Sequence, residues 1–552
     1  MNLVRGFGRR NERARAALAV LVLLSSASAG LLGGCRKSAP PAPQIQVAAT
    51  PARPEEVVAE LLLPKPHELW PRLRALAGPL SAAMPSAPEL AVAAVVGVPA
   101  LAAGSFDLRS PVVGAWVLGD AAGVVLGVHV ESGPELIAKV ASGSNPTHRV
   151  ERRGAISYLS RASGGGFAFA VCSDTVLIGP ERAVERVGEY LARAAFPKAR
   201  SEGPLVIDSS GSMKAWLVPA LRNAWSARRA ELGTELGRER ALHGRPADFA
   251  DPEAVLTALD ALVKGGVAFV ESTRDAHAEL ELPDGRVMFS LRVTPEANGA
   301  AARIVASMRP GSTALMRELP PQTAVALLHR RADDTAPAGN FARALFGARL
   351  SDADDAALSR SLEDLAAGRG DVEAVALTSD LGLVWQGDVH DANRLRAGMK
   401  SLLPLLTRPP FAAALGASVG RPSIERRASR AAGGRSEEHS VIRLSTPGPA
   451  KAKRFDLMTQ IDERRFTVSL SRDGSETERA TTGLDPAATA LLDAAGDVAW
   501  FALADLGKLG LADPAAAALV SADVSARDGA LVFSLRATDA GLRALAARGL
   551  GK

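Results

Sequence analysis

Short apolar runs and alternating apolar and polar residues dominate the chain from residue 57 onwards. Ala278–Leu282 and Val287–Val293 alternate with a period of two and flank a Pro-Asp-Gly turn sequence, which favours a β-hairpin. The stretches Glu181–Ala195 and Asp485–Ala495 are amphipathic and follow predicted strands, so we expect helices there. Hairpins outnumber strand–helix–strand units. The pattern therefore predicts an α+β fold with antiparallel sheets flanked by helices.

The same order of patterns occurs twice. Residues 112–142 align with residues 372–402, and both stretches predict a hairpin followed by an amphipathic helix. Further along, residues 285–301 align with residues 529–545 and share the sequence F-S-L-R, at Phe289–Arg292 and Phe533–Arg536. We predict a tandem duplication of one module. Because strand side chains alternate between faces, we expect Phe289 and Phe533 each to point into the core of its own module.

Composition divides the chain into four parts. We predict a signal peptide at residues 1–34, a modified cysteine with a Pro/Ala-rich spacer at 35–56, and two α+β modules at 57–320 and 321–552. Within the modules, residues 227–251 are charged and weakly helical, which is typical of a connector. Residues 421–440 are polar, charged and contain glycine, so we expect a mobile loop there.

The N-terminus carries the features of an export signal. Five arginines precede an apolar core at Ala16–Leu24, which is too short for a spanning helix of about 20 residues. The segment ends in Leu32-Gly33-Gly34-Cys35, which resembles the lipobox of bacterial lipoproteins. This resemblance implies cleavage before Cys35 and attachment of lipid to its thiol. The next residue, Arg36, is not Asp, which by the same resemblance implies sorting to the outer membrane, facing the periplasm.

Charge changes the list of expected partners. The full chain has 65 basic and 60 acidic residues, but five Arg and one Glu lie in the signal peptide, so the mature part is close to neutral. Aromatic residues make up only 4% of the chain. Neither feature favours a nucleic acid. We therefore expect a membrane contact through the lipid and a protein or small ligand in the envelope as partner.

The second cysteine, Cys172, lies among apolar residues that predict a buried strand. If Cys35 is lipidated, the mature chain has no pair of thiols for an intramolecular disulfide. The exported fold would then depend on packing alone.

One sequence motif suggests a metal site. Asp208, Ser210 and Ser212 form a D-x-S-x-S pattern after the apolar run 205–207 and before a helical stretch. This pattern resembles the metal-ion-dependent adhesion site of von Willebrand A domains. The resemblance implies that Ser210 and Ser212 ligate Mg²⁺ directly and that Asp208 acts through water. The alternative is a strand end whose Ser and Asp residues cap the next helix. The later segments predict antiparallel hairpins rather than the parallel sheet of that family, which favours the alternative.

Other motifs give little support for catalysis. The G-x-S-x-G pattern at 416–420 matches a nucleophile elbow, but a helical stretch rather than a strand precedes it. Ser351 with Asp354 is better explained as a helix cap than as a calcium loop. No cofactor is evident, with Mg²⁺ expected only under the adhesion hypothesis. Our main hypothesis is a non-enzymatic, lipid-anchored envelope protein for binding or scaffolding. A metal-dependent adhesion protein and an enzyme with a dispersed site remain alternatives.

Overall fold

The computed structural model describes residues 50–550 apart from 120–121, 142–145, 147, 162–167, 243–251, 331–350, 381, 406–420, 433–434, 446–452 and 473–482. Two compact units make up the chain. The first contains the chain up to Trp216 with Asp275–Leu291 and Leu545–Lys552, and the second contains Leu217–Arg274 and Arg292–Ala544. Among the described helices, none is long and apolar enough to cross a membrane.

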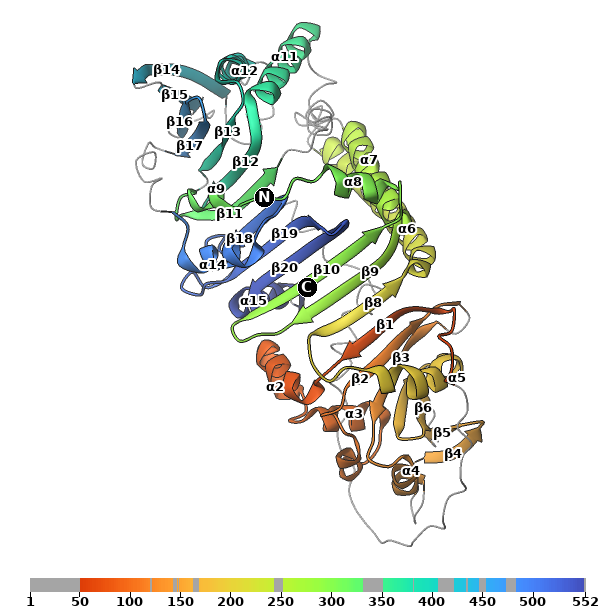
Figure 1. The fold of residues 1–552 in the computed structure, drawn as a ribbon. Helices are drawn as coiled ribbons and strands as arrows, with labels where there is room; N and C mark the ends of the chain where they lie inside the picture. The colour runs from red at the N-terminus through yellow and green to blue at the C-terminus, as the bar shows by residue number, and fades with distance from the viewer. Residues whose placement is uncertain are drawn as a thin grey trace. The chain divides into compact units, whose positions relative to one another are not determined.

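The first unit is built on an antiparallel sheet (Figure 1). Its strands lie in the spatial order β9-β8-β1-β2-β3-β7-β6-β5-β4. They are β1 (Val57–Leu63), β2 (Val112–Val117), β3 (Gly123–His129), β4 (His148–Arg153), β5 (Ile156–Arg161), β6 (Ala168–Cys172), β7 (Thr175–Gly179), β8 (Leu205–Ser210) and β9 (Thr273–Glu281), with β10 (Arg286–Pro295) following β9. The helices between these strands are α2 (Pro66–Leu76), α3 (Pro88–Val96), α4 (Gly133–Ala141) and α5 (Glu181–Tyr190).

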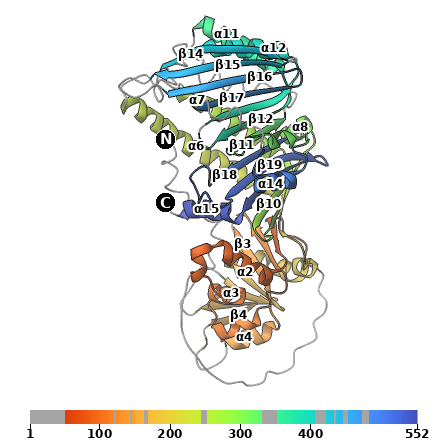
Figure 2. The same cartoon turned by 90° about the vertical axis from the view of Figure 1, so that its left-hand side faces the viewer.

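The strands of the second unit are antiparallel as well, and β14 to β17 lie side by side in Figure 2. The spatial order is β20-β19-β18-β11-β12-β13-β17-β16-β15-β14. The strands are β11 (Thr323–Arg330), β12 (Arg369–Thr378), β13 (Leu383–Val389), β14 (Arg421–Ala432), β15 (Arg435–Ser445), β16 (Lys453–Ile461), β17 (Arg465–Arg472), β18 (Trp500–Asp505), β19 (Leu519–Arg527) and β20 (Ala530–Thr538). The helices are α6 (Lys214–Leu242), α7 (Pro252–Glu271), α8 (Ala300–Ser307), α9 (Ala314–Arg317), α11 (Asp352–Gly368), α12 (Ala392–Leu405), α14 (Pro486–Ala495) and α15 (Asp539–Leu550).

The nine-strand order of the first unit recurs in the second, where β20 is added beside β19. Each strand from β1 to β9 has a counterpart whose number is ten higher, and every neighbour relation in the first order recurs in the second. The helices agree as well, because α4 and α12 follow the third strand of each set and α5 and α14 follow the seventh. The predicted α+β fold with a duplicated antiparallel module is therefore confirmed. The module boundary at residue 320 stays a prediction, since the packing units divide the chain differently.

The sequence alignment of residues 112–142 with residues 372–402 is shifted by one residue relative to the structure. It places Gly114 opposite Ala374. Ala374 is buried in the cluster beneath α14, whereas Gly114 pairs with Leu126, which pairs with Ile178 in the cluster beneath α4. A shift of one residue moves every strand side chain to the other face of a sheet. The repeat is therefore real in topology, but its alignment was wrong in register.

Each sheet buries apolar side chains on both faces. In the first unit, one face packs against α5, and we call it the α5 face; the other packs against α4 and α3, and we call it the α4 face. In the second unit, the α14 face buries Ala326, Leu328, Phe501 and Leu503 under α14. The opposite α12 face buries side chains of β16 and β17 under α11 and α12. The helix that follows the seventh strand thus covers equivalent faces in both units.

Several local predictions are confirmed. The predicted helices at 181–195 and 485–495 are present as α5 with its continuation and as α14, which Asp485 caps by accepting a hydrogen bond from Ala487 N. Ser351 caps α11 by accepting a hydrogen bond from Asp354 N at 3.2 Å. Cys172 ends β6 and is buried, as its apolar neighbours indicated. The hairpin at 278–293 is formed by β9 and β10.

Two local predictions were wrong. Residues 421–432 and 435–440 are not a loop but belong to β14 and β15, and β15 pairs with strands on both sides. Strand pairing uses backbone groups, so a polar and charged sequence does not prevent it. Phe289 and Phe533 are half-buried rather than core residues. On β20 the buried residues of F-S-L-R are its two polar ones, Ser534 and Arg536.

Candidate functional site

Apolar side chains cross the α12 face of the second unit in two continuous rows. Cross-strand pairing defines each row, because directly opposite residues point to the same face of a sheet. The first row runs over six strands from β13 to β20 and the second runs parallel to it. The first row is Trp385, Val375, Leu327, Ala502, Ala522 and Leu535, and the second is Leu383, Leu377, Val325, Ala504, Val520 and Ala537.

Among the described residues, the apolar cluster that joins helices to this face lies at one end of it. The cluster under α11 and α12 contains buried side chains of β16 and β17. Partly buried Trp385 on β13 packs against it. On the strands beyond, Leu327 is 41% exposed and Leu535 is 38% exposed. We define the open face as the half-buried and exposed apolar side chains of β11, β18, β19 and β20 on this side: Leu327, Trp500, Ala502, Ala522, Val524, Phe533 and Leu535.

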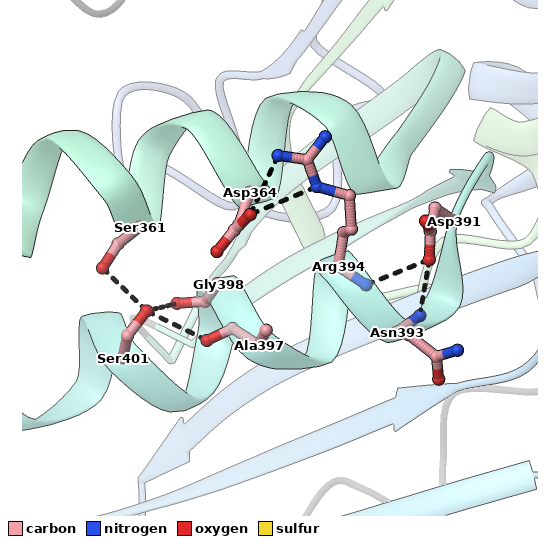
Figure 3. Close-up of polar contacts among 8 residues, drawn as sticks. All are labelled: Ser361, Asp364, Asp391, Asn393, Arg394, Ala397, Gly398 and Ser401. Carbon is pink, nitrogen blue, oxygen red and sulfur yellow. Dashed lines mark hydrogen bonds and ion pairs between the residues drawn. The ribbon is translucent and has the colours of Figure 1, made fainter.

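Polar contacts fix the covering helices against one another, as Figure 3 shows. Arg394 on α12 donates from Nε and Nη2 to Asp364 Oδ1 on α11, at 3.2 and 3.1 Å. Further along the pair, the hydroxyls of Ser361 and Ser401 are 2.8 Å apart. Asp391 caps α12 by accepting hydrogen bonds from two backbone N–H groups. Side-chain hydrogen bonds thus hold α11 and α12 together, and these two helices set where the covered part of the α12 face ends.

A fixed carboxylate borders the open face. Glu373 pairs with His329 across the strands and lies on the same face. Its carboxylate accepts hydrogen bonds from Arg369 Nη1 at 2.7 Å and Trp385 Nε1 at 3.0 Å, and His329 Nδ1 is 3.8 Å away. Burial by itself would raise the pKa of Glu373, but His329, Arg369 and Trp385 together lower it to about 2. Glu373 is therefore an anion near neutral pH, and it orients Trp385 rather than donating a proton.

The first unit has a matching arrangement. On its α4 face a row crosses β7, β3, β2, β1, β8 and β9, and it ends with half-buried Leu61 on β1, exposed Ile207 on β8 and half-buried Ala278 on β9. Near this row, Trp116 and the exposed Trp216 contact edge to face with ring centres 5.0 Å apart. The equivalent strands of both units thus leave the equivalent face partly open.

The residues of the predicted metal motif lie at the end of β8. The hydroxyls of Ser210 and Ser212 are 2.5 Å apart, so the structure brings these two together. Asp208 Oδ1 instead lies 2.5 Å from Nδ1 of His277 on β9. β8 is antiparallel to both β1 and β9, unlike the first strand of an adhesion domain. In the described part of the chain there is no cluster of three metal-ligating side chains; the Mg²⁺ site stays a prediction. Cys35 lies outside the described residues.

Sequence reasoning missed three residues of these arrangements. His277 and Glu279 are two residues apart on β9, so their side chains lie on the same face of the strand. His277 is directly opposite Asp208 on β8. The His-Ala-Glu sequence was a signal for the first pairing, but only strand register shows the contact with Asp208. Glu373 lies in a strand and is surrounded by donors from β11, β12 and β13. Arg369 is only four residues from Glu373, but His329 and Trp385 reach it across neighbouring strands, so no local pattern could have revealed the full set.

Comparison with known proteins adds little. No protein-family model matches the chain, and no curated protein matches it. One solved structure, titled "Structure of crystal form III of TP0453", aligns with 48% of this chain and 90% of its own length, at 7% identity and a TM-score of 0.23. That likeness is too weak to support an argument about fold or function. The strand order therefore defines the protein class: an α+β chain in which one antiparallel strand order occurs twice.

Proposed function

We propose that the protein is a lipid-anchored, non-enzymatic protein of the bacterial envelope whose folded part binds a partner protein. The open face of the second unit is the observation that supports this proposal. The lipid anchor rests on the signal sequence and on Leu32-Gly33-Gly34-Cys35. The proposed location is the outer membrane, facing the periplasm, because Arg36 follows the lipidated cysteine.

The open face favours binding because it leaves contiguous apolar area in water. Burying one leucine or phenylalanine side chain is worth about 1.5–3 kcal/mol, and Leu327, Phe533 and Leu535 are each only partly buried. Large contiguous apolar patches on soluble folds commonly mark protein interaction sites. An uncovered face that spans four strands therefore favours an interaction surface.

The sizes of the side chains indicate the kind of partner. In the row that contains Leu327 on β11 and Leu535 on β20, the central strands β18 and β19 present Ala502 and Ala522, and the larger Trp500 and Val524 lie two residues further along these strands. Strands lie about 4.8 Å apart, so the two leucines are separated by about three strand spacings. That is wider than the diameter of an α-helix, about 10–12 Å. An amphipathic helix that places its apolar side on the alanines fits this arrangement.

The two alternatives predict different behaviour. A Mg²⁺-dependent adhesion protein would bind its partner through Asp208, Ser210 and Ser212 and would lose binding when chelator is added. An enzyme with a dispersed site would turn over a substrate. Binding through the open face should withstand chelator, and it should depend on apolar side chains of the second unit.

A photo-crosslinker tests the surface in living cells. Benzoyl-phenylalanine in place of Leu327 or Leu535 should give one discrete crosslinked polypeptide, the same for both positions. The matched control is Leu262 on α7, which is 62% exposed but lies on a helix. In addition, Leu327→Glu should abolish the crosslink from position 535, because a buried carboxylate is costly to desolvate, while leaving the circular dichroism spectrum unchanged.

Two outcomes would contradict the proposal. One is equal crosslinking from positions 262, 327 and 535, which would indicate random collisions. The other is the absence of a discrete crosslink from either position in the open face, although the protein is present in the envelope.

A further inference from the structure

Two tryptophan rings of the first unit meet at one end of its sheet. Trp116 is near the end of β2, and Trp216 lies in the first turn of α6. Their ring centres are 5.0 Å apart and the ring planes are inclined at 64°, an edge-to-face contact. Trp116 is half-buried, whereas Trp216 is 43% exposed. This tryptophan pair therefore presents an indole surface to solvent.

Further apolar side chains lie in the next row on the same face. Gly114, two residues before Trp116 on β2, pairs with half-buried Leu61 on β1. Leu61 in turn pairs with Ile207 on β8, which is 37% exposed. The tryptophan pair thus belongs to a partly exposed apolar surface, the kind of surface that commonly marks a binding site.

The Pro/Ala-rich spacer at 35–56 enters the first unit at this same end of the sheet. β1 begins directly after the spacer, and its third residue, Ala59, pairs with Trp116 on one side. On the other side Ala59 pairs with Ser209, close to the end of β8 and shortly before Trp216 in the chain. The start of β1 and the tryptophan pair are therefore neighbours in space.

The spacer carries a sequence that aromatic surfaces bind. Residues 39–43 read Ala-Pro-Pro-Ala-Pro and contain a P-x-x-P pattern at Pro40 and Pro43; they lie outside the described residues. P-x-x-P segments dock on aromatic side chains as polyproline II helices, and the docking costs little conformational entropy because proline already favours that shape. The spacer and the tryptophan pair are therefore chemically matched.

The length of the spacer permits this contact within one chain. Thirteen residues separate Pro43 from the first residue of β1, and an extended chain of that length spans about 45 Å. A flexible connection of this kind holds the ligand at an effective concentration in the millimolar range. Even a weak contact between prolines and tryptophan would then be occupied.

We propose that residues 39–43 of the spacer bind the tryptophan pair of the same chain, with prolines packed on the exposed part of Trp216. The contact shortens the tether between lipid and fold. With Pro40 bound, residues 36–39 alone separate the lipid from the first unit, about 12 Å of extended chain instead of about 60 Å for residues 36–54. The shorter tether rests on the proposed anchor at Cys35, whereas the contact itself does not.

A photo-crosslinker in the spacer of the full chain tests the contact. Benzoyl-phenylalanine in place of Ala42 should crosslink to the peptides that contain Trp116 or Trp216, as identified by mass spectrometry. A mixture of ¹⁵N-labelled and unlabelled protein should show that the crosslink forms within one chain. Trp216→Ala should weaken the crosslink about tenfold, as truncation of a tryptophan anchor does. The matched control is Leu101→Ala in the same unit, where Leu101 is 82% exposed, and it should leave the yield unchanged.

A second measurement covers the case in which Trp216→Ala does not fold. In protein labelled with 5-fluorotryptophan, the ¹⁹F resonance of Trp216, assigned by its loss in Trp216→Phe, should shift when Pro40, Pro41 and Pro43 are all replaced by alanine. Replacing Gln44 and Gln46 by alanine leaves the prolines in place and should leave the resonance unmoved.

Three outcomes would overturn the proposal. One is a set of crosslinks from position 42 that is spread over the surface of the protein. Another is a crosslink from position 42 only to other chains or to a different polypeptide. The third is a Trp216 resonance that the triple proline substitution does not shift.

Discussion

At the scale of single residues, the F-S-L-R sequence divides its four side chains between two environments. On β20, Ser534 and Arg536 point to the buried face, where Arg536 forms an ion pair with Asp523 on β19. Phe533 and Leu535 point to the open face. The apolar positions of this strand are thus the exposed ones and the polar positions are the buried ones, the reverse of what alternation in the sequence indicated.

The buried ion pair leads to a prediction about stability and pH. Burial raises the pKa of Asp523 more than Arg536 lowers it. Keeping Asp523 ionised in this buried position therefore costs free energy even with Arg536 beside it. Arg536→Met should destabilise the second unit by about 3–5 kcal/mol, since it leaves a buried carboxylate without its cation. The loss should be smaller at pH 5 than at pH 8, because Asp523 can then take up a proton.

Exchange of the β19 and β20 amides as a function of urea measures this loss without assuming that both units unfold together. The control is Arg292→Met, at the equivalent arginine of the first F-S-L-R sequence. The side chains of Arg292 and its partner Asp528 are 42% and 83% exposed, so the expected change is within about 0.5 kcal/mol. Equal losses in the two variants would show that burial of Arg536 is unimportant.

At the scale of elements, α11 and α12 decide where the covered part of the α12 face ends. Their crossing depends on two glycines. A Cβ at Gly368 would lie 2.4 Å from Leu395 N, and one at Gly398 would lie 2.8 Å from Leu365 N. Because these near atoms belong to the backbone, the helices must separate to admit even a methyl group.

We therefore expect Gly368→Ala to destabilise the second unit by about 1–3 kcal/mol. Exchange of the α11 and α12 amides would locate the effect in the helix pair. Gly265→Ala on α7 serves as the control, since its Cβ meets nothing within 4 Å and alanine improves helix propensity by about 1 kcal/mol. That variant should be more stable than the wild type. Opposite signs for the two substitutions are expected, and equal signs would contradict the close-packing argument.

At the scale of the whole molecule, the proposed anchor leaves one free thiol in the mature protein. Cys172 is buried, and burial raises the pKa of its thiol. The mature protein should therefore show no fast-reacting thiol when folded and one after denaturation. Cys35→Ala should remove the lipid and shift the protein out of the membrane fraction.

The mass of the mature N-terminal peptide, together with fractionation, measures both effects. Cys172→Ala is the control, and it should leave the fractionation unchanged. A Cys35→Ala protein that remains membrane-bound and acylated would exclude Cys35 as the attachment point. Recovery of the wild type in inner-membrane fractions alone would contradict the sorting expected from Arg36.

The sequence alone determined the features that depend on local order. Turn residues and the period of two predicted hairpins, helices and antiparallel sheets, and the repeated order of these elements predicted the duplication. Capping at Ser351 and the burial of Cys172 were also predictable, because each depends on neighbours within a few residues. The expectation of a lipid anchor likewise rests on a contiguous motif at Cys35.

Only the tertiary structure decided the register and the faces. The F-S-L-R strand alternates in the same way whichever face is buried, so its pattern could not show that Phe533 lies on the open face. Strand pairing brought His277 to Asp208 over 69 positions of sequence and set the donors around Glu373. The open face arises because α11 and α12 stop at β13, and the position of a helix on a sheet depends on packing between distant segments. Such contacts have no signature within any one segment, which is why the sequence could predict the modules but not the open face.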